Sequence, residues 1–138
     1  MTWNWTGFFI VAAGWNLLIG ISGVLRPLQT MEVLFGEVRD DPITLLLHRI
    51  CASMVLIFGL GYLIIAVDPA ANAGLIILGI IAKIWISLVW YYQNYRGVAR
   101  PAASVAAIGD TLFTLAFLLF LLGEPQPEWI VVALRGGN

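Results

Sequence analysis

The chain has 138 residues, of which 61% are hydrophobic and 11% charged, and its formal net charge at pH 7 is −1. Soluble globular domains average about 45–50% apolar and about 25% charged residues. This difference excludes an ordinary soluble enzyme and a disordered segment, and the lack of a basic surface excludes nucleic acid as a partner. One Cys and one His exclude a disulfide framework, a Cys/His zinc site and a bis-His haem site within one chain. The composition indicates an integral membrane protein, for which we expect no metal and no cofactor.

Four segments have the length and apolar character of transmembrane helices, each of which needs about 20 mostly apolar residues to cross the hydrocarbon core. Pro27 follows the first segment, and Pro101 begins the fourth. Asp41 and Pro42 form the cap and first position of the second. We therefore expect an all-α integral membrane protein with four transmembrane helices in an antiparallel bundle, as a single domain over residues 1–138. The predicted spans cover about residues 7–25, 42–67, 73–95 and 101–122.

The longest connection, between the first two spans, contains apolar residues at helical spacing: Leu28, Met31, Leu34 and Phe35. This pattern predicts a short amphipathic helix on the inner membrane surface. Residues 128–134 are apolar but too short to span, so we expect them at the outer interface.

Basic residues predict the orientation of the chain. Arg26, Arg39 and Arg49 flank the first loop, and Arg96 and Arg100 flank the third. The positive-inside rule places both loops in the cytoplasm and both termini outside it. We expect a multi-pass protein of the bacterial inner (plasma) membrane, with the lipid bilayer as its partner.

Each predicted span has one face of small and polar residues. Small residues let helices approach closely in lipid, and polar groups there form hydrogen bonds between helices. We expect these faces inside the bundle. In chain order they are Phe9, Ala13, Asn16, Gly20 and Gly23; His48, Ala52, Val55, Gly59 and Tyr62; Gly79, Lys83, Ser87, Trp90 and Asn94; and Ala103, Ala107, Asp110, Thr114 and Phe117.

Asn16, Lys83 and Asp110 each lie near the middle of their span. A charged residue at this depth costs roughly 2.5–3.5 kcal/mol on insertion scales, so an isolated Lys83 and an isolated Asp110 would each carry that cost. We expect the two to form an ion pair, with Asn16 completing the hydrogen bonds. The candidate binding or proton-relay residues are Asn16, Lys83, Asp110, His48, Ser87 and Thr114.

The predicted pair has several interpretations. It can lock the third and fourth spans in register, relay protons, anchor a polar head group, or support a Schiff base on Lys83 with Asp110 as counter-ion. His48 and Cys51 are three residues apart on one helix, close enough to suggest a Cys–His nucleophile. A reactive thiolate needs an electropositive setting, however, and Arg49 lies on a different face of the helix. We expect His48 to form a hydrogen bond at a helix interface near the head groups.

The chain resembles a family of small four-span bacterial membrane proteins, from about residue 7 to residue 122. The strings that carry the resemblance, in the same order, are Trp15-Asn16-Leu17-Leu18-Ile19-Gly20, the stretch from Gly59 to Pro69, the segment around Lys83, and Gly109-Asp110-Thr111-Leu112-Phe113. The resemblance implies the architecture and singles out Asn16, Lys83 and Asp110. It implies no established activity.

Short loops and small-residue faces favour a non-enzymatic membrane component or subunit, as a homo-oligomer or within a larger membrane complex. The alternative is an oligomeric carrier or binding protein for a small ion or an amphipathic molecule, with Asn16, Lys83 and Asp110 as its site. The third hypothesis is a membrane enzyme acting on a lipid or isoprenoid, with Asp110 or His48 as general acid or base. No second carboxylate accompanies Asp110 within the spans, so we favour the non-enzymatic hypotheses.

Overall fold

The computed structural model describes residues 4–123, which fold into helices and, within this part of the chain, no strands. The four longest helices are long and apolar enough to cross a membrane, so the expected all-helical, four-span architecture is confirmed. The predicted interfacial segment 128–134 lies outside the described residues. In chain order the helices are α1 (Trp5–Leu25), α2 (Pro27–Phe35), α3 (Pro42–Val67), α4 (Ala73–Tyr95) and α5 (Pro101–Gly123).

The ends of the helices follow from their caps. The side chain of Asp41 accepts a hydrogen bond from the backbone N–H of Thr44 at 2.9 Å, which fixes the start of α3 as expected. α1 begins at Trp5, slightly before the predicted start, because Asn4 Oδ1 accepts a hydrogen bond from the backbone N–H of Gly7 at 2.9 Å. Side-chain capping at Asn4 therefore adds a half-turn that hydropathy alone did not include.

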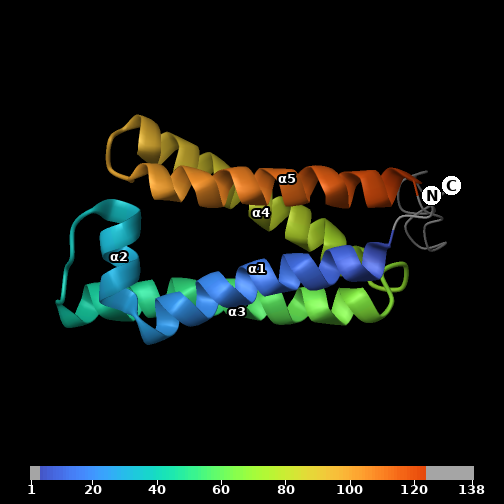
Figure 1. The fold of residues 1–138 in the computed structure, drawn as a ribbon, viewed down its shortest axis with the longest axis horizontal. Helices are drawn as coiled ribbons and strands as arrows, with labels where there is room; N and C mark the ends of the chain where they lie inside the picture. The colour runs from blue at the N-terminus through green and yellow to red at the C-terminus, as the bar shows by residue number, and fades with distance from the viewer. Residues whose placement is uncertain (1–3, 124–138) are drawn as a thin grey trace, which may run out of the picture.

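The long helices form two antiparallel pairs. α1 packs along α3, and α4 packs against α5, while α4 crosses obliquely from the start of α5 to the end of α3 (Figure 1). We call these the α1/α3 pair and the α4/α5 pair. The beginning of α1 and the end of α5 lie at one end of the bundle, and α2 lies at the other (Figure 1).

Glycines allow the close approach within the α1/α3 pair. A Cβ added at Gly23 would lie 2.6 Å from the Cβ of Ala52, and one added at Gly59 would lie 2.9 Å from Leu17 Cγ. Gly23, Ala52 and Gly59 are buried, as the predicted small-residue faces require. In lipid, where burial of apolar surface does not favour association, such close packing is one of the attractions that hold helices together.

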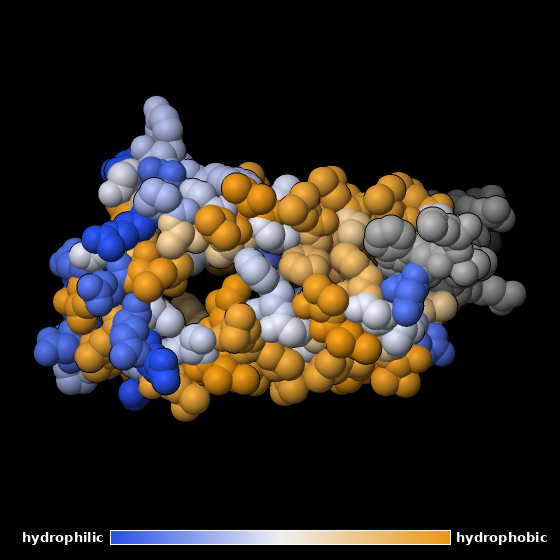
Figure 2. Space-filling model, viewed as in Figure 1, coloured by the Kyte–Doolittle hydropathy of each residue, from blue (hydrophilic) through white to orange (hydrophobic). Residues whose placement is uncertain are grey.

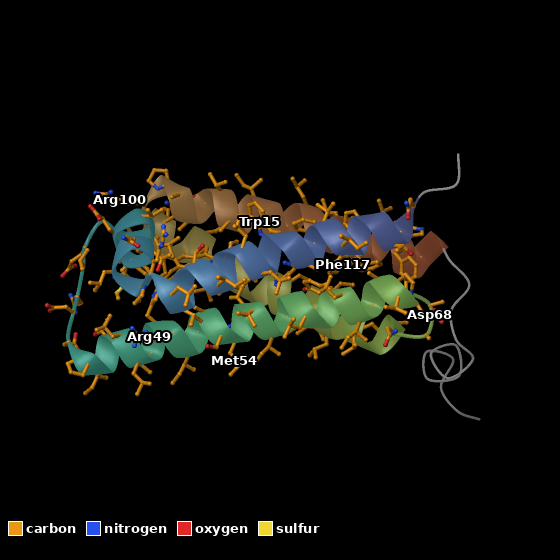
Figure 3. All side chains as sticks on the ribbon, turned by 60° about the horizontal axis from the view of Figure 1, so that its bottom comes forward. Trp15, Arg49, Met54, Asp68, Arg100 and Phe117 are labelled. Carbon is orange, nitrogen blue, oxygen red and sulfur yellow. The ribbon has the colours of Figure 1, made fainter. Side chains whose placement is uncertain are left out.

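Large aromatic side chains fill the space between the two pairs in the half of the bundle away from α2. The ring centroids of Phe9 and Phe117 lie 5.1 Å apart, those of Tyr62 and Phe117 lie 5.2 Å apart, and those of Trp5 and Phe120 lie 5.1 Å apart. Phe117 is among the largest fully buried side chains and is labelled in Figure 3. The two pairs thus meet through aromatic rings.

α2 lies across one end of the bundle instead of along it (Figure 1). Met31 packs inward and is 4% exposed, the ring of Phe35 lies 5.7 Å from that of Trp90, and the backbone N–H of Arg100 donates to the Leu34 carbonyl at 2.7 Å. Hydrophilic residues gather at this end, apolar residues cover the middle, and the surface is hollowed between α2 and the long helices (Figure 2). The amphipathic helix expected from the sequence is thus present and packs on the bundle.

Candidate functional site

Lys83 is the centre of a polar cluster at the middle of the bundle. Its ammonium Nζ donates to Asp110 Oδ1 at 2.5 Å and to Asn16 Oδ1 at 3.2 Å. Lys83 is 3% exposed and Asn16 is 6% exposed. The predicted face of each helix points these side chains inward, so residues of α1, α4 and α5 meet. We call Asn16, Lys83 and Asp110 the polar cluster.

Aromatic rings enclose the Lys83 ammonium. Its Nζ lies 5.4 Å from the ring centroid of Tyr62 and 5.3 Å from that of Phe113. These are distances at which the negative face of a ring attracts a cation, and the attraction is larger away from water. Tyr62 belongs to α3, so all four spans contribute to the surroundings of this one charge.

The two partners of the ion pair are enclosed to different degrees. The Lys83 side chain is 4% exposed, whereas the Asp110 side chain is 15% exposed. Asp110 therefore lies at the edge of the polar cluster, and Lys83 lies inside it.

Two buried donors beside the polar cluster have no hydrogen-bond partner among the described residues: the indole Nε1 of Trp15 and the hydroxyl of Tyr62. The Trp15 ring packs against Gly109, where an added Cβ would lie 2.7 Å from Trp15 Cζ2. The Tyr62 hydroxyl lies against Gly79, one helical turn before Lys83. An unpaired buried hydroxyl or N–H group costs roughly 1–3 kcal/mol on mutational scales, so the region has unused hydrogen-bonding capacity.

Ser87 and Thr114 are buried, as their helix faces predict, but they bond to backbone carbonyls. The Ser87 hydroxyl donates to the Ala107 carbonyl at 3.2 Å and so joins α4 to α5. The Thr114 hydroxyl donates to the carbonyl of Asp110 at 2.8 Å, within its own helix. The structure thus places these two candidates beside the polar cluster without a bond to its charged groups.

His48 does not bond to the polar cluster. Its Nε2 lies 2.7 Å from Thr30 Oγ1, which ties α3 to α2 through an interface hydrogen bond of the kind expected from the sequence. Cys51, which could form a Cys–His nucleophile with His48, is exposed. Within residues 4–123, no three His, Cys, Asp or Glu side chains come together to hold a metal ion.

Sequence reasoning missed several members of this region. Trp15, Tyr62 and Phe113 surround the polar cluster. Tyr62 could have been identified from the sequence, because it occupies the inward face predicted for α3. The sequence does not indicate where the indole of Trp15 lies, since its position depends on how closely α5 approaches α1.

Comparison of the chain with protein-family models, with curated proteins and with solved structures gives no match. The polar cluster is therefore the feature of this molecule from which a function can be inferred.

Proposed function

We propose that this polytopic membrane protein is a non-enzymatic binding protein or carrier for a neutral amphipathic molecule. The ligand places a hydrogen-bond-accepting group, such as a carbonyl or a hydroxyl, beside Lys83 and Asp110. The observation that supports this proposal best is that two buried donors near the polar cluster, Trp15 Nε1 and Tyr62 Oη, have no hydrogen-bond partner among the described residues.

An ion pair that served only to hold helices together would not need these donors. Phe in place of Tyr62 would fill nearly the same volume without a buried hydroxyl that lacks a partner. No water competes for such groups in the hydrocarbon core, so an acceptor on a ligand gains most of the hydrogen-bond energy. The unused capacity of Trp15 and Tyr62 therefore favours a role in binding.

Charge balance favours a neutral ligand over an ion. Lys83 and Asp110 neutralise each other, so an added ion would bring an uncompensated charge to mid-membrane. Such a charge costs roughly 2.5–3.5 kcal/mol on insertion scales. An amphipathic molecule can reach the cluster from the bilayer, and the partial exposure of Asp110, at 15%, marks the side from which it would arrive.

The experiment compares three probes of equal chain length: a medium-chain ketone, alcohol and carboxylate. Each is added to purified protein in detergent, and thermal unfolding is followed. We expect the ketone and the alcohol to stabilise the protein more than the carboxylate. Tyr62→Phe should reduce this stabilisation, and Tyr91→Phe, which removes a hydroxyl on the exposed side of α4, should retain it. Equal stabilisation of wild type and Tyr62→Phe, or no stabilisation by any probe, would contradict the proposal.

A second candidate is a purely structural component, as a homo-oligomer or as a subunit of a larger membrane complex. The observation that favours it is the hydrogen bond from Lys83 to Asn16, which links the α4/α5 pair to α1. In that case no probe should stabilise the wild type, and the double variant Lys83→Met with Asp110→Leu should fold and assemble as wild type does. Loss of probe binding in a well-folded double variant would favour the binding protein.

We also propose that the chain lies in a bacterial inner membrane with the α2 end in the cytoplasm. Four basic residues belong to the loops and helix ends on the α2 side of the bundle: Arg26, Arg39, Arg96 and Arg100. Arg49 lies two turns inside α3 on the same side. This distribution agrees with the positive-inside rule, which correlates basic loops with the cytoplasmic side.

A further inference from the structure

A cleft of about 570 Å³ lies at the α2 end of the bundle, where the end of α1, the start of α2 and the first turns of α3 meet. Its charged lining consists of Arg26 and Arg49, and its apolar lining includes Leu25, Leu28 and Leu45. No acidic side chain lines it among the described residues. The cleft therefore combines positive charge with a leucine surface.

Neither arginine in the cleft is neutralised by a carboxylate of the described chain. Within residues 4–123 the ion pairs are Arg39 with Glu37 and Lys83 with Asp110, so Arg26 and Arg49 keep their full charge. A guanidinium presents several N–H donors in a planar fork that matches the oxygens of a phosphate group. Two arginines line this one cleft, and their side chains are of the type that binds an anion with several oxygens.

The start of α2 adds to the positive character of the cleft. Arg26 is its N-cap residue and makes no side-chain capping hydrogen bond, so the first backbone N–H groups of α2, at Leu28 and Gln29, are not capped by it. The N-terminus of a helix carries a partial positive charge that attracts anions. Leu28 and Gln29 line the cleft together with Arg26 and Arg49.

The cleft lies level with the end of α1. Gly23, two residues before the end of α1 at Leu25, lies against Ala52 and close to His48 Nε2, which an added Cβ would approach to 3.7 Å. Arg49 is therefore level with the end of the α1 span, where hydrocarbon gives way to head groups. Arginine stems lie along apolar surface there and keep the guanidinium at the polar boundary. Figure 3 labels Arg49 on α3 at this end of the bundle.

From these observations we infer that the cleft binds the head group of an anionic phospholipid. Arg26 and Arg49 hold the phosphate, and the leucines of the lining contact the upper part of the acyl chains. Basic pockets between transmembrane helices on the cytoplasmic side are a recognised means of binding anionic lipid head groups. This site is separate from the polar cluster, so it does not depend on the function proposed above.

The experiment measures lipid binding to the full chain in detergent by native mass spectrometry. Phosphatidylglycerol and phosphatidylcholine with identical acyl chains are the probes, and inorganic phosphate is the competitor. Wild type should bind one phosphatidylglycerol per chain in preference to phosphatidylcholine. In the double variant Arg26→Gln with Arg49→Gln, the affinity for phosphatidylglycerol should fall by about tenfold or more. A loss of this size is expected when charge-assisted hydrogen bonds are removed. The control, Arg39→Gln with Arg96→Gln, loses the same charge at the same end of the bundle, away from the cleft.

Each outcome decides the inference. Retained binding in the control and weakened binding in the cleft variant support it. Equal weakening in both variants would show a diffuse attraction to the basic end and would overturn it. If wild type shows no preference for phosphatidylglycerol over phosphatidylcholine, that result alone would also overturn the inference. Displacement of the lipid by millimolar inorganic phosphate would show that the cleft takes a free anion and would overturn the assignment to a lipid.

Discussion

Gly20 of α1 lies directly against the backbone of Leu56 in α3: an added Cβ would come within 2.6 Å of the Leu56 nitrogen. Gly20→Ala should therefore force the helices apart and destabilise the protein by about 1–3 kcal/mol. The matched control is Gly14→Ala in the same helix, because an added Cβ there meets nothing within 4 Å. The control should be neutral or stabilising, since alanine favours helix over glycine by up to about 1 kcal/mol. Unfolding in mixed detergent micelles measures both, and equal effects would contradict the close approach.

Asp110→Asn should be strongly destabilising, because it leaves the Lys83 ammonium buried without a counter-charge. Removal of one partner of a buried ion pair costs roughly 3–5 kcal/mol, whereas replacing both partners with apolar residues is often close to neutral. Lys83→Met should therefore restore most of the stability lost in Asp110→Asn. Denaturant unfolding of the two single variants and the double variant gives the coupling between the sites. Additive losses would show that the two side chains do not interact.

Thr30→Val should loosen α2 from α3, because it removes the hydroxyl that lies 2.7 Å from His48 Nε2. The expected loss is about 1 kcal/mol, typical of one hydrogen bond. The effect should be local, so amide hydrogen exchange should rise in α2 while the long helices keep their protection. Gln29→Ala, on the exposed side of α2, serves as the control. A uniform rise in exchange over all helices would argue against a local tether.

Asp41 should make the start of α3 sensitive to acid. Hydrogen bonds from Thr44 hold the pKa of the Asp41 carboxyl below its ordinary value of 3.8. A group whose pKa is lowered by folding contributes its stabilisation above the ordinary value and loses it as the pH falls through the lower, folded pKa. Amide exchange in the first turn of α3 should therefore increase below about pH 4 relative to Asp41→Asn, which caps a helix without titrating. The same pH response in both proteins would contradict this.

The proposed orientation can be tested with single cysteines in a Cys51→Ser background. Ala71→Cys lies in the short connection after Asp68, at the end of the bundle opposite α2, and Asp40→Cys lies in the loop before α3. Figure 3 labels Asp68 at the first of these ends. A membrane-impermeant maleimide should label the Ala71→Cys variant in intact cells and should label the Asp40→Cys variant only after lysis. The reverse labelling pattern would show that the α2 end lies outside the cytoplasm and would contradict the proposed orientation.

The positions of the four spans and their inward faces could be predicted from the sequence. Hydropathy and prolines mark the helices, and the recurrence of small and polar residues every three to four positions identifies the face that must avoid lipid. Phe9, Asn16 and Gly20 on α1, and Gly79, Lys83 and Ser87 on α4, are all buried. The contact of Lys83 with Asp110 and Asn16 could also be predicted, because the three residues lie at equal depth and an isolated charge there is costly.

The neighbours of each face could not be predicted in the same way. Helical periodicity gives the direction in which a side chain points, but not which helix stands opposite. That α1 packs most closely on α3, and that Tyr62 and Phe113 close over the Lys83 ammonium, depend on interhelical distances set by Gly20, Gly59 and Gly109. The bond between His48 and Thr30 depends on how α2 folds back, which hydropathy does not encode.

Both charges of the polar cluster lie on the same side of the boundary between the helix pairs, since Lys83 is in α4 and Asp110 is in α5. Across that boundary the cluster's hydrogen bond is accepted by the neutral amide of Asn16. Moving the pairs apart would break this bond, at about 1.5–3 kcal/mol for a bond to a charged group, and would leave the ion pair intact. The aromatic contacts would be exchanged for contacts with equally apolar lipid tails. Separation of the two pairs at the midplane would therefore not require the separation of opposite charges in a medium that cannot solvate them.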